Sequence, residues 1–299
     1  MSASKEAAER ADALEDEGSR KKDEGDEAGA LASYLEALAL HRERPTTLYN
    51  VGLIYKYRRD WQSSLRYNRM ALELEPADIP TNWNLAIAAT ALRDWRTARE
   101  AWHRVGIELD DHEGPIVDDF GYTPVRLNGF EDRDSAVEVV WAKRLSPVTA
   151  RIDNIPTLAA RFRYGDVVLH DGAGTGTRVD ADGLERPVFN VLELFEPSPY
   201  ITYEACIAAP DKQAVEALVA AFTSAGIECE DWTANMHVIC KACSEGGAEG
   251  QHTHHEPPSD EWRMERLIGV AARDPVRVEA VLEFWTAGDP TRRVESLDT

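Results

Sequence analysis

The chain has 299 residues, of which 43% are hydrophobic and 29% charged, a composition typical of a globular protein and not of a disordered one. No apolar run reaches the roughly 18 residues that span a bilayer. Residues 1–27 contain no apolar stretch of the kind found in secretory signals, so we expect a cytoplasmic protein. The net charge of −21 is concentrated beyond residue 110, where 17 basic residues stand against 34 acidic ones. Such a surface repels phosphate groups, and we therefore expect neither nucleic acid nor an anionic membrane as a partner.

The first 112 residues repeat with a period of 34 residues. Three sets of residues share this step: Asp26, Asp60 and Asp94; Gly18, Gly52 and Ala86; Ala30, Ser64 and Ala98. Small residues are expected where two helices cross, because a larger side chain would hold the backbones apart. Asp60 and Asp94 stand in turns, where an aspartate can cap the helix that follows.

These residues resemble the tetratricopeptide repeat family over residues 11–112. The second unit follows the family pattern at Leu48, Asn50, Gly52, Tyr55, Ala71 and Pro76. The resemblance implies three pairs of antiparallel helices that stack into a solenoid with a concave face. Solenoids of this kind bind other polypeptides more often than they catalyse reactions. We therefore predict a tetratricopeptide-repeat domain of three helix pairs over residues 1–112.

In this family the first helix of each pair lines the concave face. The matching positions of the second and third units are Thr46, Tyr49, Leu53, Lys56 and Tyr57, then Pro80, Trp83 and Ile87. Family members that grip a terminal carboxylate use Lys, Arg and Asn at these positions, whereas here the only cations are Lys22 and Lys56. An apolar and aromatic strip, which is typical of a contact surface, lies beside Lys56. It consists of Tyr49, Leu53, Tyr57, Trp83 and Ile87. We expect either a protein partner or the chain's own C-terminal domain to lie there.

The rest of the chain is predicted to be a linker at residues 113–136, rich in glycine and proline, and an α+β domain at residues 137–299. Short β-rich runs with glycine turns indicate a small β-barrel or curled antiparallel sheet, with Gly172 to Gly176 at a hairpin tip. Beyond residue 200, strands alternate with two helical segments. That pattern predicts a ferredoxin-like α+β segment after the tetratricopeptide helical solenoid and the β-barrel-like segment. Cys206 and Cys229 fall on predicted strands and are interpreted as small buried residues.

Part of this second half resembles a bacterial family of uncharacterised small domains. The matching motifs are Val140-Trp141-Ala142, Asp153-Asn154-Ile155-Pro156, Tyr164-Gly165-Asp166-Val167-Val168 and Ser198-Pro199-Tyr200 with Tyr203. The resemblance implies a β-barrel joined to an α/β half, and it implies no activity. His170 and Asp171 are interpreted as a strand end and a turn, since no nucleophile signature accompanies them.

A cluster of cysteine and histidine residues at positions 240–255, in a predicted loop, has the spacing of metal ligands. Cys240 and Cys243 have the spacing of a zinc knuckle, and a short glycine-containing stretch separates them from His252, His254 and His255. Two thiolates and two imidazoles would close a tetrahedral structural zinc site. A redox-active cysteine pair, a catalytic or transiently loaded metal, and incidental cysteines are the alternatives.

The sequence thus predicts a non-enzymatic cytoplasmic protein–protein interaction adaptor with a structural zinc site. The alternative is a metal-dependent enzyme, or a metal- or redox-responsive protein, that uses the Cys/His cluster while the repeats recruit its substrate or partner.

Overall fold

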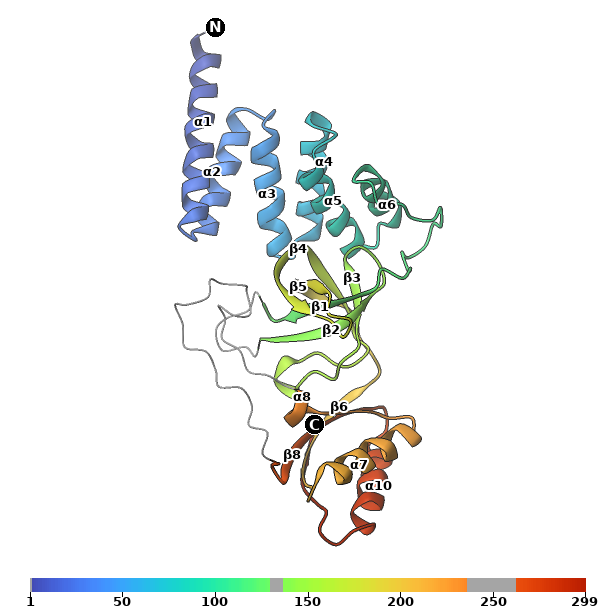
Figure 1. Cartoon of the computed structure of the whole chain (residues 1–299). Helices are drawn as coiled ribbons and strands as arrows, with labels where there is room; N and C mark the ends of the chain where they lie inside the picture. Colours follow the sequence, from blue (N-terminus) through green and yellow to red (C-terminus); the bar gives the residue numbers. More distant parts are fainter. Residues whose placement is uncertain (1, 130–136, 236–261) are drawn as a thin grey trace. The chain divides into compact units, whose positions relative to one another are not determined.

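The computed structural model describes residues 2–129, 137–235 and 262–299 (Figure 1). The chain divides into two compact units, residues 1–117 and 118–299, and each is described by itself. No helix in the described ranges is both long enough and apolar enough to cross a membrane.

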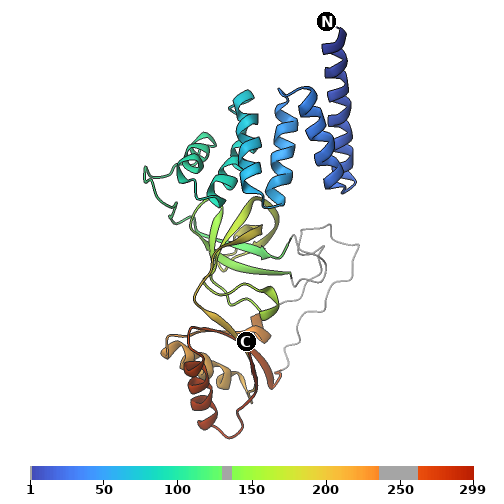
Figure 2. The same ribbon diagram turned by 180° about the vertical axis from the view of Figure 1, so that it is seen from behind.

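The first unit consists of six helices arranged as three pairs (Figure 1 and Figure 2). The pairs are α1 (Ser2–Asp23) with α2 (Glu27–Leu40), α3 (Pro45–Tyr57) with α4 (Trp61–Leu74), and α5 (Ile79–Ala91) with α6 (Trp95–Arg104). Successive pairs also pack together, through α2 on α3, α4 on α5, and α3 on α5. The 34-residue period therefore corresponds to one helix pair, and the predicted helical N-terminal region is confirmed.

The three repeated aspartates begin the second helix of each pair, as predicted for Asp60 and Asp94. Their carboxylates accept hydrogen bonds from the backbone N–H groups of Gly29, Ser63 and Thr97 at 2.9, 3.1 and 3.2 Å, respectively. The residue before each aspartate is left-handed: φ is 82° at Gly25, 58° at Arg59 and 59° at Arg93. A left-handed residue reverses the chain at the end of a helix, so the same tight turn is built three times.

The small repeated residues lie where the paired helices cross. The Ser64 hydroxyl donates a hydrogen bond to the Gly52 carbonyl at 2.9 Å, which joins α4 to α3. A Cβ atom on Gly52 would lie 2.7 Å from Nδ2 of Asn68, and one on Gly18 would lie 2.6 Å from the ring of Tyr34. Glycine at these positions therefore allows close approach of the helices. The apolar core around them comprises Ala30, Leu31, Tyr34, Leu38, Leu48, Val51, Ile54 and Ala71.

The second unit begins with five strands that close into a barrel in sequence order. They are β1 (Tyr122–Leu127), β2 (Glu138–Arg144), β3 (Thr149–Ile152), β4 (Val167–Val179) and β5 (Glu185–Glu196), with a short 3₁₀ turn at Leu158–Ala160. Neighbouring strands are antiparallel except β1 and β5, which are parallel. An up-and-down sheet with an odd number of strands must close on one parallel pair, because its first and last strands run in the same direction. The interior holds Val125, Leu127, Val140, Ala142, Ala150, Ile152, Ala160, Val168 and Val191.

Two local predictions in this region are wrong. The predicted linker at residues 113–136 contains β1, whose Val125 and Leu127 are fully buried. Pro124 is tolerated there because β1 pairs with β5 only at Val125 and Arg126, which leaves Pro124 paired with β2 alone. Gly172 to Gly176 do not form a hairpin tip but lie within β4, where register shifts mark β-bulges that curve this long strand.

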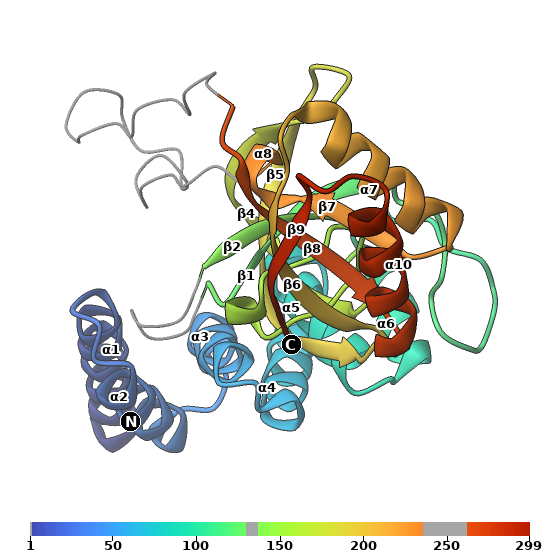
Figure 3. The same ribbon diagram turned by 90° about the horizontal axis from the view of Figure 1, so that it is seen from below.

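A four-stranded antiparallel sheet follows the barrel, with two helices on one face (Figure 3). Its elements are β6 (Ile201–Ala208), α7 (Lys212–Ser224), β7 (Glu228–Asp231), α8 (Trp232–Asn235), β8 (Glu265–Ala272), α10 (Pro275–Ala287) and β9 (Arg293–Asp298). The strand order is β7-β8-β6-β9. Apolar residues of α7 and α10 bury the helical face of this sheet, namely Val215, Leu218, Phe222, Val278, Leu282 and Trp285. The described chain is thus a helical region followed by a strand-rich region with two sheets.

Several of the motifs on which the predicted resemblance to a bacterial domain family rests lie at the junction of the barrel and this sheet. Asn154 accepts a hydrogen bond from the Trp141 backbone at 2.7 Å and donates one to Oε1 of Glu230 on β7 at 3.0 Å. The same Glu230 oxygen accepts the Ile155 N–H at 3.2 Å, and the Ile155 carbonyl accepts the indole N–H of Trp232 at 3.1 Å. These residues hold the two sheets together, which gives them a structural role.

Candidate functional site

The predicted strip lies on two neighbouring helices of the first unit. Tyr49, Leu53, Lys56 and Tyr57 are on α3, and Trp83 and Ile87 are on α5, which packs against α3. On α3, Tyr49, Leu53 and Tyr57 recur at every fourth position and so share one face of the helix. On α5, Trp83 and Ile87 have the same spacing. The structure therefore brings the two predicted sets together on adjacent helices.

The members of the strip differ in exposure. Tyr57 is 39% exposed, Tyr49, Leu53 and Trp83 are half-buried, and Lys56 and Ile87 are buried at 3% and 1%. The Trp83 ring packs edge-on against the buried Trp102 of α6, with 4.8 Å between ring centroids. This contact restricts the movement of the Trp83 side chain. Nζ of Lys56 lies 4.5 Å from the ring centre of Tyr57. Two aromatic side chains of the strip, Trp83 and Tyr57, are thus held in contact with neighbouring residues.

A hollow of about 220 Å³ lies at one end of the strip, where α3 and α5 begin and α4 ends. Its lining consists of Pro45, Thr46, Tyr49, Ala71, Glu75, Asp78, Pro80 and Thr81. Oδ2 of Asp78 accepts the N–H and the hydroxyl of Thr81, at 2.9 and 2.5 Å, and so caps α5. Two of the lining residues are acidic and none is basic. The hollow therefore favours an uncharged or cationic group over an anion.

The basic side chains near the concave positions are held by other residues of the unit. Nζ of Lys22 lies 3.2 Å from Oδ1 of Asn50. Arg44 binds Asp12 at 2.8 Å and Glu15 at 2.8 Å through Nε, so it joins α1 to the start of α3. Burial acts to lower the pKa of Arg44, but the hydrogen bonds to Glu15 and Asp12 outweigh it and raise that pKa. This face of the unit is therefore poor in cations that could bind an anionic peptide.

Sequence reasoning missed the acidic lining of the hollow and the Arg44 bridge. Glu75, Asp78 and Arg44 lie at helix ends, outside the positions that the repeat pattern assigns to the concave face. The one available signal was the pairing of Asp78 with Thr81, an N-cap spacing that places a carboxylate beside the start of α5.

The predicted zinc ligands Cys240, Cys243, His252, His254 and His255 lie outside the described residues. Within the described ranges no group of three or more His, Cys, Asp or Glu side chains has the arrangement of a metal site.

The two other cysteines lie on strands, as predicted, but are half-buried and not fully buried. Burial raises the pKa of the Cys229 thiol to about 12, aided by the neighbouring carboxylates of Asp231, Glu230 and Glu228. The pKa of Cys206 is likewise raised by burial and by its hydrogen bond to Glu265. Both thiols are therefore protonated at neutral pH and lack the thiolate that a nucleophile needs.

His170 is a core residue of the barrel and not a catalytic group. Its side chain is fully buried, and Nδ1 lies 2.8 Å from the Asp171 carbonyl. Burial lowers the pKa of its imidazole to about 4, so the ring is neutral near pH 7. The predicted structural role of these two residues agrees with this arrangement, but their predicted placement at a strand end and a turn is wrong, because both lie within β4.

The helix register and the repeated caps and crossings define the first unit as tetratricopeptide-like. No protein-family model matches the chain, and no curated protein matches it significantly. Among solved structures, the chain is similar to the second TPR of Spaghetti (RPAP3) bound to the HSP90 peptide SRMEEVD. The match has 17% identity and a TM-score of 0.33, and it covers 35% of this chain and 96% of that one. The first TPR of the same protein, bound to the same peptide, gives 17% identity, a TM-score of 0.31 and coverage of 33% and 78%. The match to the Arabidopsis OM64 TPR domain has 14% identity and a TM-score of 0.31, and it covers 33% of this chain and 82% of that one. All three matches extend over about a third of this chain.

Proposed function

We propose that this chain is a non-enzymatic cytoplasmic adaptor that binds a partner polypeptide along α3 and α5. The observation that carries the proposal is the strip of Tyr49, Leu53 and Trp83 beside a hollow, on the face that tetratricopeptide repeats use for binding. Aromatic side chains held rigidly by their neighbours lose little conformational entropy on binding, which favours them as anchors.

The charges beside the strip indicate which segment of a partner would fit. Glu75 and Asp78 line the hollow, and Lys22 is engaged by Asn50. A segment that ends in an acidic, carboxylate-terminated sequence is therefore a poor match. An apolar segment with a neutral or basic side chain next to it is the better one.

The test is a pair of substitutions, Tyr49→Ala and Trp83→Ala, in the full chain. The partner is first captured on the wild-type protein, identified and purified, and its dissociation constant is then measured by calorimetry. Each substitution is expected to weaken binding by about 2 kcal/mol, or roughly 30-fold, as is common for aromatic anchors. Gln62→Ala, an exposed change on α4, is the matched control and should leave the affinity unchanged. Equal affinity of all four proteins would reject the strip as the binding face.

The alternative occupant of the strip is the chain's own second unit. In that case Tyr49→Ala and Trp83→Ala would raise amide hydrogen exchange in the second unit and would not change any external affinity. The same two variants therefore distinguish an external partner from an internal one.

We also propose a structural zinc site at Cys240 and Cys243 with two of His252, His254 and His255. The ligand spacing supports it. Protein prepared without a chelator or metal-binding tag should contain close to one zinc per chain by elemental analysis, and Cys240→Ser should abolish it. If the wild-type protein contains no zinc, the proposed zinc site is rejected.

The same spacing of cysteines and histidines supports the second candidate function, a metal-dependent enzyme or a metal- or redox-responsive protein. Three protein ligands plus water, or a reversible disulfide between the two cysteines, would favour that candidate.

For the second unit we propose a ferredoxin-like assignment of the four-stranded sheet. The strand order β7-β8-β6-β9, with α7 between β6 and β7 and α10 between β8 and β9, supports it. The motifs shared with the bacterial domain family support a relationship over the barrel and its junction with the sheet.

A further inference from the structure

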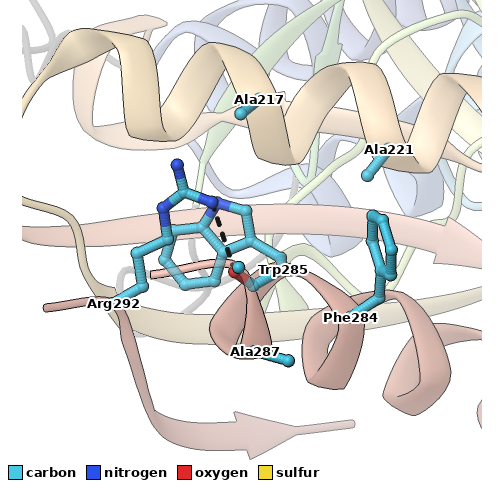
Figure 4. Close-up of a pocket in the computed structure, with 7 residues that line it drawn as sticks. Ala217, Ala221, Phe284, Trp285, Ala287 and Arg292 are labelled. Carbon is cyan, nitrogen blue, oxygen red and sulfur yellow. Dashed lines mark hydrogen bonds between the residues drawn. The ribbon is translucent and has the colours of Figure 1, made fainter. Parts of the chain in front are cut away.

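The helical layer of the second unit contains a hollow that no part of the adaptor proposal uses. It has a volume of about 340 Å³ and lies between α7 and the end of α10. Figure 4 shows Arg292 stacked with Trp285 on one side, Phe284 on the other, and Ala217 and Ala221 of α7 above them. Ala287 and Gly288 complete the lining. The volume lies within the range of small-ligand sites, which are roughly 300–1,000 Å³.

The wall formed by Trp285 is rigid. This residue is 2% exposed, and its indole N–H donates a hydrogen bond to the Ala214 carbonyl on α7 at 2.8 Å. Nη1 of Arg292 donates to the Trp285 carbonyl at 3.3 Å, and the guanidinium carbon lies 5.5 Å from the centre of the indole ring. Gly288 makes this approach possible, because a Cβ atom there would lie 3.2 Å from Nη1 of Arg292. The cation is thus held at a fixed place beside the hollow.

Arg292 has a hydrogen-bonding deficit. Its Nε–H is buried and has no acceptor among the residues that the structure describes. No carboxylate in the described part of the chain forms an ion pair with it. The neighbouring Asp289 accepts hydrogen bonds from the N–H and hydroxyl of Thr291 at 2.8 and 2.6 Å, and these bonds lower its pKa more than the charge of Arg292 does. A buried guanidinium donor without an acceptor is unfavourable, and a carboxylate is the group whose geometry best matches this fork of donors.

The opposite wall is apolar and open to solvent. Phe284 is 75% exposed, the largest exposed fraction among the large apolar side chains that the structure describes. Across the hollow lie only the small side chains of Ala217 and Ala221, which leave space beside the Phe284 ring. Aromatic rings favour stacked or edge-on neighbours, so a ring inserted between Phe284 and Trp285 would gain contacts that solvent does not provide.

We propose that this hollow binds a carboxylate carried on an aromatic or other apolar group. The apolar group lies between Phe284 and the Trp285 indole, under the two alanines of α7, and the carboxylate accepts hydrogen bonds from Arg292. The ligand is either a free small acid or the terminal residue of a peptide chain. This site is independent of the strip on α3 and α5.

The test is a titration of the full chain with 3-phenylpropionate, followed by amide chemical shifts in isotope-labelled protein. We expect saturable shifts confined to α7, α10 and the turn before β9. The neutral analogue 3-phenylpropionamide, and the variant Arg292→Met with the original acid, should each bind at least tenfold more weakly. Phe284→Ala should also weaken binding. Arg293→Met is the matched control and should bind as the wild type does. Arg293 follows Arg292 in the sequence, does not line the hollow, and is paired with Glu295 at 3.2 Å.

The source of the ligand is distinguished by a second probe. N-acetyl-L-phenylalanine binding more tightly than 3-phenylpropionate indicates a peptide terminus, and the reverse order indicates a free acid. The proposal is overturned if 3-phenylpropionate gives no saturable shift at about 10 mM. It is also overturned if Arg292→Met binds the acid as tightly as the wild type while circular dichroism shows an unchanged fold.

Discussion

The buried His170 makes the stability of the barrel depend on pH. The ring stacks on Phe189, with 4.9 Å between ring centroids, and its Nε2 has no hydrogen-bond partner within residues 2–129, 137–235 and 262–299. Burial lowers the pKa of the imidazole to about 4; the Asp171 carbonyl opposes this shift, and the nearby Arg144 charge adds to it. In the unfolded chain the same imidazole has a pKa of about 6.5.

The magnitude follows from these two pKa values. Between pH 6.5 and 4 the unfolded chain binds a proton that the folded chain does not, so the free energy of unfolding falls as the pH falls. The loss begins near pH 6.5 and is nearly complete at pH 4. At about 1.4 kcal/mol per pH unit, it amounts to roughly 3 kcal/mol.

The assay compares the wild type with His170→Phe by urea unfolding at pH 7, 6, 5 and 4. Hydrogen exchange of β4 and β5 reports the barrel alone, because a chain of two units need not unfold in one step. At pH 7 the variant should be the less stable protein, by about 1 kcal/mol, since it lacks the hydrogen bond to the Asp171 carbonyl. The gap between wild type and variant should then shift by roughly 3 kcal/mol in favour of the variant by pH 4.

The comparison with the variant is essential because other buried groups titrate in the opposite sense. Burial raises the pKa of Glu138 and of Glu230, so acidification through these raised pKa values relieves two unfavourable buried charges. Both effects are present in both proteins and cancel in the difference. His103→Phe, which replaces an exposed histidine on α6 of the first unit, is the control and should leave the hydrogen exchange of β4 and β5 unchanged. A gap that stays constant from pH 7 to pH 4 would refute the assignment of His170 as a neutral core residue.

Three further predictions follow from packing and charge. Gly52→Ala should destabilise the repeats by about 1–3 kcal/mol in thermal melts followed by circular dichroism, because its methyl group would crowd Asn68. The loss should shrink in an Asn68→Ala background, and an equal loss in both backgrounds would contradict the contact. Asp60→Ala should lower the stability of the repeats by about 1 kcal/mol in the same assay through loss of the cap on α4, and an unchanged melting temperature would show that the cap is not needed. Glu230→Gln keeps an acceptor for its two hydrogen bonds and removes a charge that burial disfavours, so the second unit should be at least as stable as the wild type at pH 7 and its advantage should vanish as the pH falls through the raised pKa. A marked loss of stability at pH 7 would mean that the negative charge itself is required there.

The repeats were predictable because each residue of the period has a local task. Asp60 caps a helix and Gly52 allows a crossing, and both tasks are fulfilled within 16 residues of the chain. The placement of Tyr49 and Trp83 on one face follows from helical periodicity alone. Their half-buried state does not follow from it, because burial depends on neighbours such as Trp102, and the repeat pattern does not predict which residues pack against these side chains.

The second unit was less predictable because its strands are defined by distant partners. Glycine and proline near β1 indicate a linker when read locally, yet Val125 and Leu127 are recruited into the barrel by strands that follow later in the chain. The glycines of β4 indicate a turn locally, whereas pairing with β5 uses them as bulges. The hollow beside Arg292 could not be predicted at all, since Ala217, Phe284 and Arg292 are unremarkable until two helices cross.

The parallel pairing of β1 with β5 sets the order in which this molecule can be built. Contacts across that seam, from Thr123 to Pro187 and from Arg126 to Asn190, span 64 residues, whereas each helix pair joins residues that are near neighbours in the chain. Contacts between near neighbours form fastest, and a growing chain presents them first. The repeats can therefore fold during synthesis, before β5, the partner of β1, has left the ribosome. During that interval the unpaired edge of β1 is open to wrong pairing, and a chaperone that shields it would assist this protein more than one that acts on the repeats.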